Sequence, residues 1–311
     1  MDRFSLMAQI LSDNLEENIE FILSQSVPSR FCDLAAAGKN SGKIRLVDET
    51  RQHAGSFKYR GAVLGVSKNP QGVIACGSGN FPIAVGLAAS NLGIPATLVM
   101  PEDAPVPKRE MALNSGSEVL LVPRPDFVDR AEQEAKKRGL PLLHPFRDAS
   151  MLIGSCSLGA ELARTIKMKG SADDAVVVAC GGGGLAAGTA LGIRISGMDN
   201  DIYVAEPKNY PRLEAAISVS RPVEITPKEQ TICDALRVTE VGSLAFQVIK
   251  KIGVHTLLSS DTSVLDAQAR MHRETGVKAE PSGALALAAI SENELPRQYS
   301  RLWVIVCGGN V

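Results

Sequence analysis

The sequence predicts an α/β fold with two lobes, each containing a parallel sheet flanked by helices. Three observations predict it. Short apolar runs rich in β-branched residues alternate with helical patterns, as strand–helix units do. The chain has 311 residues, of which 45% are hydrophobic, which is enough for two cores. Three glycine-bearing turns directly follow apolar runs, which places them at the carboxyl ends of strands, where α/β proteins bind ligands.

The first series of strand–helix units occupies the segment from about residue 72 to 147. Its strands are expected at 72–76, 96–100, 118–122 and 142–144. Its helices are expected at 81–92, 108–115 and 128–138. Because successive strands alternate with helices, they are expected to pair in parallel.

The second series lies in the remainder of the chain. The run at 175–179 is wholly apolar and mostly β-branched, as a central parallel strand should be. Further strands are expected at 202–205 and 302–306, with helices at 185–195, 243–252, 262–275 and 282–290. Pro281 suits the start of the last helix because its missing N–H is not needed there. The two series predict two lobes with a crevice between them.

Bulk properties exclude several classes of protein. The formal net charge is −1 and aromatic residues make up 4%, so neither nucleic acid nor an anionic membrane is an expected partner. No apolar run approaches the roughly 18 residues of a membrane-spanning helix. Residues 1–13 lack the features of a secretory signal, so we expect a cytoplasmic protein. Scattered cysteines and unclustered histidines predict reduced thiols and no metal site.

A lysine in a cramped, apolar context is the first candidate for chemistry. Lys58 lies in the segment G-S-F-K-Y-R-G-A at 55–62. Ser56 is expected to cap a helix, which would place Lys58 in the first turn, partly desolvated and with a lowered pKa. Such an amine can attack an aldehyde and later move a proton. An ordinary solvated lysine is the alternative.

A run of four glycines is the second candidate. It follows the 175–179 strand and precedes a helix, and it consists of Gly181, Gly182, Gly183 and Gly184. Glycines let several N–H groups point at one anion, and the helix N-terminus adds a favourable field. A tight turn without a ligand is the alternative, since neither a dinucleotide nor a Walker pattern is present. An amine and a phosphate site together suggest pyridoxal phosphate, whose aldehyde forms a Schiff base with lysine.

Three other positions are candidates for the same crevice. The turn at 77–80 could hold a substrate carboxylate with its N–H groups, with Asn80 donating to the cofactor, or it could be an ordinary turn. Cys307 could face the pyridine nitrogen, or it could be a buried cysteine at a strand end. Glu280 could be a crevice carboxylate, or it could be a charge at a helix N-terminus.

These segments resemble the fold type II (tryptophan synthase β-like) pyridoxal-phosphate enzymes, most closely the serine/threonine dehydratase and serine racemase branch. The G-S-F-K-x-R-G-A lysine segment is specific to this branch. The other matching segments lie at 77–80, 144–146, 181–185, 280–284 and 307–310. The resemblance extends from about Asp48 to the end of the chain. It implies a large cofactor-binding domain formed by 1–70 and 148–311, and a small substrate-side domain at 71–147.

By this resemblance, Lys58 holds the cofactor and is the base that removes the α-proton of an amino-acid substrate. The implied cofactor contacts are Phe57, Lys58, Asn80, Gly181, Gly182, Gly183, Gly184, Leu185, Glu280 and Cys307. The implied substrate contacts are Ser78, Gly79, Asn80 and Phe81. The implied reaction is β-elimination from an L-β-hydroxy amino acid such as threonine or serine, giving a 2-oxo acid and ammonia. The family also implies a homodimer.

Several positions depart from the pattern of the branch. Gly77 replaces the first serine of the substrate loop and Phe81 replaces a histidine, which predicts an altered substrate. Ser78 keeps the hydroxyl that racemases use as a second base, so an amino-acid racemase with Ser78 as a catalytic residue is an alternative. A non-catalytic sensor of the cofactor or of an amino acid is another. Arg212 stands where the branch's cation site needs a second carboxylate beside Glu206, so no metal is predicted.

Overall fold

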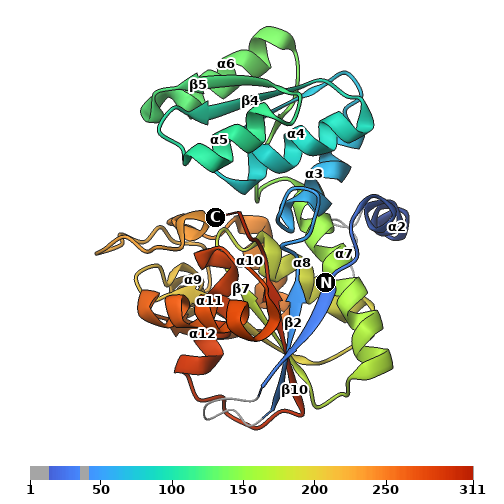
Figure 1. The fold of residues 1–311 in the computed structure, drawn as a ribbon, viewed down its shortest axis with the longest axis vertical. Helices are drawn as coiled ribbons and strands as arrows, with labels where there is room; N and C mark the ends of the chain where they lie inside the picture. Colours follow the sequence, from blue (N-terminus) through green and yellow to red (C-terminus); the bar gives the residue numbers. More distant parts are fainter. Residues whose placement is uncertain (1–13, 36–41, 311) are drawn as a thin grey trace.

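A computed structural model describes residues 14–35 and 42–310, and it shows two lobes, each built around its own sheet (Figure 1). The larger sheet has six strands in the order β1-β2-β10-β7-β8-β9. They are β1 (Arg30–Leu34), β2 (Lys43–Asp48), β7 (Ala175–Ala179), β8 (Asp201–Pro207), β9 (His255–Ser259) and β10 (Arg301–Val306). All neighbours pair in parallel except β1, which is antiparallel to β2.

The smaller sheet has four parallel strands in the order β5-β4-β3-β6. They are β3 (Val73–Cys76), β4 (Ala96–Pro101), β5 (Glu118–Val122) and β6 (Leu142–Leu143). Parallel pairing confirms the predicted α/β class, because each crossover between parallel strands needs a helix.

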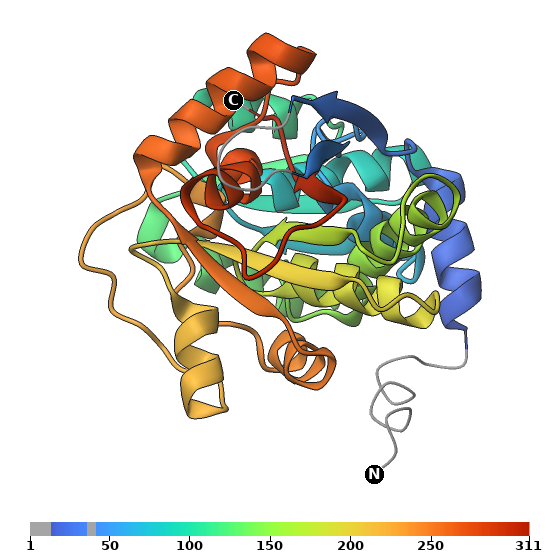
Figure 2. The same ribbon diagram turned by 90° about the horizontal axis from the view of Figure 1, so that it is seen from below.

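Helices cover both faces of the larger sheet (Figure 2). Along β7, Val176 and Val178 face one core and Val177 faces the other, as the two-residue period of a strand requires. The first core is closed by α7 (Ala149–Lys169), α8 (Gly184–Ile195), α9 (Arg212–Val219) and α10 (Ser243–Ile252). The second is closed by α11 (Asp261–Thr275) and α12 (Pro281–Glu292).

Glycines let α7 and α8 approach each other closely. A Cβ on Gly159 would lie 2.2 Å from the carbonyl oxygen of Thr189, and one on Gly192 would lie 2.2 Å from that of Cys156. Since real Cβ atoms do not approach backbone that closely, larger residues would force the helices apart. The close packing fixes α8, and therefore the loop that precedes it.

The smaller sheet is covered by α4 (Asn80–Leu92) on one face and by α6 (Phe127–Arg138) on the other. Helix α3 (Lys58–Ser67) contributes Val63 and Leu64 to the same core as α4, and α5 (Val106–Leu113) closes its edge. Helix α2 (Leu15–Gln25) packs on α3 and α7 through Ile22 and Ile19. Two short 3-10 helices lie at Arg124–Asp126 and Asp234–Leu236. The domain boundaries given by the sequence stay a prediction.

The expected Ser56 cap is wrong. Helix α3 begins at Lys58 after Phe57, and the Ser56 hydroxyl is buried without a partner among the described residues. The reason is that Ser56 forms an isolated β-bridge with Gly308, which holds its backbone outside the helix. Lys58 nevertheless lies in the first turn, as expected.

No helix within residues 14–35 and 42–310 is long and apolar enough to cross a bilayer. No group of three or more His, Cys, Asp and Glu side chains in the same ranges is arranged to hold a metal ion.

Candidate active site

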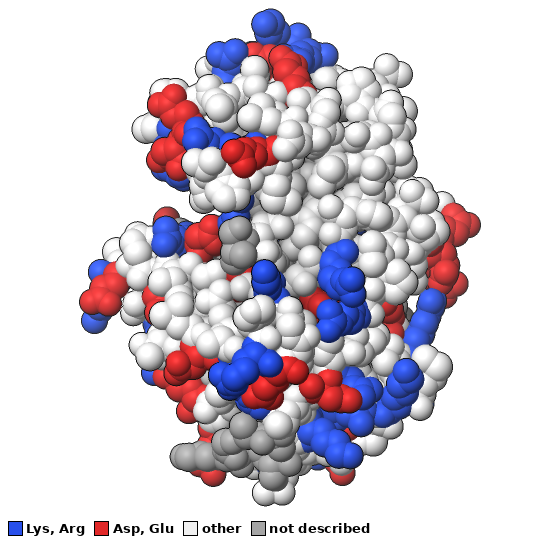
Figure 3. All heavy atoms as spheres, in the orientation of Figure 1, with Lys and Arg blue, Asp and Glu red and all other residues white. Residues whose placement is uncertain are grey.

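A cavity of about 810 Å³ lies between the two lobes, where Figure 3 shows a notch in the molecular surface. We call it the interlobe cavity. Turns at the carboxyl ends of β3, β7 and β10 form its wall, as expected for parallel α/β sheets. Every residue that the sequence predicted to contact cofactor or substrate lines it: Phe57, Lys58, Ser78, Gly79, Asn80, Phe81, Gly181, Gly182, Gly183, Gly184, Leu185, Glu280 and Cys307.

The Lys58 amine lies inside this cavity. Its Nζ donates a hydrogen bond to the carbonyl oxygen of Pro145 at 3.0 Å and lies 4.8 Å from the centre of the Phe57 ring. Burial lowers the pKa of Lys58 to about 8, and the neighbouring Cys307 opposes this shift only in part. Burial disfavours the charged form of an amine. At this pKa about a tenth of the amine is neutral at pH 7 and about half at pH 8, and a nucleophile or base requires this neutral form.

The glycine loop lines the same cavity as Lys58 and has room only for glycine at two positions. A Cβ on Gly182 would lie 2.5 Å from the ring of Phe146, and Gly183 has a left-handed backbone with φ of +88°. The first N–H groups of the following helix, α8, have no partners within the helix. Loop and helix end together form a cradle for an anion.

Arg212 holds the start of this loop. Its fully buried guanidinium donates to the carbonyl oxygens of Cys180, Gly181 (2.9 Å) and Tyr210 (2.8 Å). It also lies 3.8 Å from a carboxylate oxygen of Glu206. The guanidinium therefore occupies the space beside Glu206, and its hydrogen bonds connect this position to the glycine loop.

A polar cluster at the cavity wall connects the two lobes. Asn80 donates to Glu280 at 2.6 Å and accepts from Asn310 at 2.9 Å, so its amide orientation is fixed from both sides. Burial raises the pKa of Glu280 to about 7, although Lys108 lowers it in part. The Lys108 amine, 5% exposed, lies 2.8 Å from Asp234 and 3.7 Å from Glu280. Sequence reasoning missed Lys108 and Asp234.

The Cys307 thiol and the Ser282 hydroxyl lie together in the lining of the cavity. The thiol donates to the carbonyl oxygen of Ser282 at 3.6 Å, and burial raises its pKa. The Ser282 hydroxyl is fully buried and has no hydrogen-bond partner in the described part of the chain. An unpartnered buried hydroxyl costs free energy unless a ligand satisfies it. Sequence reasoning did not single out Ser282.

The residues present fit pyridoxal phosphate. A low-pKa amine can bond its aldehyde, the glycine cradle suits its phosphate, and the orphaned Ser282 hydroxyl can donate to its ring nitrogen. The family model described as "Pyridoxal-phosphate dependent enzyme" matches residues 28–308. The chain belongs to this family.

Other members of the pyridoxal-phosphate family resemble this chain over most of its length. The L-threonine ammonia-lyase of Thermotoga maritima is 31% identical over 279 residues, which are 87% of this chain and 68% of that protein. The serine racemase of Schizosaccharomyces pombe is 31% identical over 271 residues, which are 85% of this chain and 82% of that protein.

Solved structures agree with these relatives. A threonine deaminase from T.th. superposes with a TM-score of 0.86 at 28% identity, covering 96% of this chain and 97% of that one. Maize serine racemase superposes with a TM-score of 0.85 at 26% identity, covering 96% of this chain and 93% of that one. The matches confirm the predicted family, the fold type II architecture and the cofactor.

Proposed function

We propose that this pyridoxal-phosphate enzyme is an ammonia-lyase. It removes the β-hydroxyl and the amino group of an L-β-hydroxy amino acid such as threonine or serine and releases a 2-oxo acid and ammonia. The observation that carries the proposal is that the Lys58 amine of lowered pKa and the glycine cradle line one cavity. Relatives named L-threonine ammonia-lyase and L-threo-3-hydroxyaspartate ammonia-lyase support it.

The residues of the cavity take separate roles in this reaction. Pyridoxal phosphate, when bound, supplies an electron sink for the bond electrons of the α-carbon. Lys58 Nζ takes the α-proton, since its neutral form is available near neutral pH. The N–H groups of the glycine loop hold phosphate, and those at the start of α4 hold the substrate carboxylate. Phe81, buried and apolar, keeps water from that end of the cavity.

The test is turnover by the purified holoprotein with a panel of L- and D-amino acids. We expect 2-oxo acid from L-threonine or L-serine and a change in the absorption band of the bound cofactor. Lys58→Ala should abolish 2-oxo acid formation, with exposed Lys68→Ala as the matched control at the end of the same helix. Full activity in Lys58→Ala would show that the assigned base is wrong.

A racemase acting on serine-like amino acids is the second candidate. The observation that favours it is Ser78, which lines the cavity in the loop that leads into α4. A hydroxyl there can exchange a proton with the face of the α-carbon opposite Lys58. Ser78→Ala should then abolish the interconversion of L- and D-serine while sparing 2-oxo acid formation. Chiral chromatography of the reaction mixture distinguishes racemisation from 2-oxo acid formation.

A non-catalytic sensor is the third candidate, and Gly77 and Phe81 motivate it because they alter the substrate loop. Thermal stabilisation by an amino acid without any turnover would support it. The predicted homodimer is tested by light scattering of the holoprotein.

A further inference from the structure

A second cavity of about 320 Å³ lies outside the proposed active site and shares no lining residue with the interlobe cavity. Residues from four separate segments line it. They include Arg30 on β1, Asp48, Thr50 and Arg51 at the end of β2, and Lys278 and Gly309 near the C-terminal part of the chain. We call it the basic cavity.

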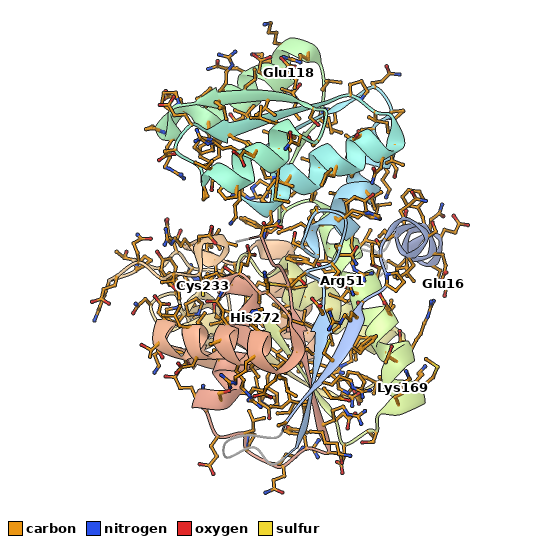
Figure 4. All side chains as sticks on the ribbon, viewed as in Figure 1. Glu16, Arg51, Glu118, Lys169, Cys233 and His272 are labelled. Carbon is orange, nitrogen blue, oxygen red and sulfur yellow. The ribbon has the colours of Figure 1, made fainter. Side chains whose placement is uncertain are left out.

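Three cationic side chains surround this cavity. Arg51 and Lys278 are exposed, Arg30 is half-buried, and none has an ion-pair partner within the described residues. The Arg30 guanidinium is oriented by a hydrogen bond to the carbonyl oxygen of Thr275 at 3.1 Å. Figure 4 labels Arg51, and Figure 3 shows Lys and Arg atoms gathered on the same face around that place. Unpaired cations around a concave surface attract an anionic ligand.

Asp48 adds an opposite charge inside the basic cavity. It is 2% exposed and pairs with Arg30 in the register of the β1–β2 ladder. Its Oδ1 accepts from the N–H and hydroxyl of Thr50, at 2.9 and 2.6 Å. Its Oδ2 is buried and has no hydrogen-bond partner among the residues described. A buried carboxylate oxygen without a partner is costly, and an ammonium group is the ligand chemistry that would satisfy it.

We propose that the basic cavity binds a free acidic α-amino acid such as L-aspartate. Its ammonium pairs with Asp48 Oδ2, and its two carboxylates pair with Arg30, Arg51 and Lys278. Three positive groups and one negative group give the site a charge of about +2, which complements a ligand carrying one ammonium and two carboxylates. The volume is at the lower end of the roughly 300–1,000 Å³ of ligand pockets, which suits a molecule of this size. This inference does not depend on the reaction proposed above.

The experiment is calorimetric titration of the holoprotein with L-aspartate and with succinate, which has both carboxylates but no ammonium. We expect saturable binding of L-aspartate and at least about tenfold weaker binding of succinate, because only the amino acid can pair with Asp48. Asp48→Asn keeps an acceptor for Thr50 and should lower the affinity for L-aspartate to that for succinate. No saturable binding of L-aspartate up to about 10 mM overturns the proposal.

Two surface variants separate this cavity from the interlobe cavity and do not threaten folding. Arg51→Gln and Lys278→Gln should each weaken L-aspartate binding by about tenfold, whereas Lys169→Gln, the same charge change at the exposed end of α7, should not. If L-aspartate binds equally well to all three variants, it occupies the interlobe cavity and the proposal is wrong.

Discussion

Replacing Lys58 by methionine should stabilise the cofactor-free protein by an amount that falls as the pH rises. Burial lowers the pKa of Lys58 from 10.5 to about 8 in the folded protein. Between these two values the unfolded chain binds more protons, so wild-type stability rises with pH there. The penalty for burying the charge is complete below about pH 8 and is lost above about 10.5. It amounts to about 3 kcal/mol at pH 7 and about 1 kcal/mol at pH 9.5.

The assay is urea unfolding of both apoproteins at pH 7 and pH 9.5 and constant ionic strength. Trp303, the single tryptophan, is fully buried and reports unfolding by fluorescence. The free energy of unfolding should be higher for Lys58→Met than for wild type, and this difference should be about 2 kcal/mol larger at pH 7 than at pH 9.5. Exposed Lys68→Met, at the end of the same helix, is the control and should stay within about 0.5 kcal/mol of wild type. If the difference in free energy of unfolding between Lys58→Met and wild type is equal at both pH values, the reasoning is refuted.

Three further predictions concern the walls of the interlobe cavity. Ser282→Ala should weaken cofactor binding to the apoprotein by about tenfold in a fluorescence titration. Cys307→Ala should weaken it less, since the thiol already donates to a carbonyl. A larger loss of affinity in Cys307→Ala than in Ser282→Ala would contradict this prediction. Arg212→Met should lower the free energy of unfolding in urea by about 3–5 kcal/mol, because the buried Glu206 carboxylate loses its cationic neighbour and the loop carbonyls lose their donors. An unchanged free energy of unfolding would count against the anchoring role. Burial raises the pKa of Glu280 from 4.5 to about 7, so this carboxyl lowers stability as the pH rises through that range. Glu280→Gln should remove this loss of stability between pH 5 and pH 8, measured by urea unfolding at both pH values. The same loss between the two pH values in Glu280→Gln as in wild type would argue against this assignment.

Predominantly apolar strands could be predicted from the sequence almost to the residue. The strands at 118–122 and 175–179 have the predicted bounds. Helix α7 was missed, because it is buried on most sides and rich in small residues such as Gly154 and Ser157, so it has no amphipathic period. Strands β1 and β2 were missed because charged residues such as Arg30 and Arg45 interrupt their apolar pattern.

The candidate site was predictable where a short segment encodes its own geometry. Glycine turns after strands mark the carboxyl ends of a parallel sheet, which meet in space whatever their separation in sequence. Lys108 carries no such local signal. Its partner Asp234 is 126 residues away, and only the packing of the two lobes brings the pair together. Ser282 was overlooked for a related reason, since a hydroxyl in the first turn of a helix is common and only its lack of a partner is informative.

The strand order of the larger sheet has a consequence for how the chain folds during synthesis. Strand β10 lies between β2 and β7, yet it is made after every other strand of the sheet. Until residue 306 has left the ribosome, the β1–β2 hairpin and the β7–β8–β9 group each expose an apolar edge with unpaired backbone groups. The smaller sheet needs only residues 73–143 and has no such delay. We therefore expect the smaller lobe to form first during translation, and nascent chains shorter than 306 residues to depend most on chaperones.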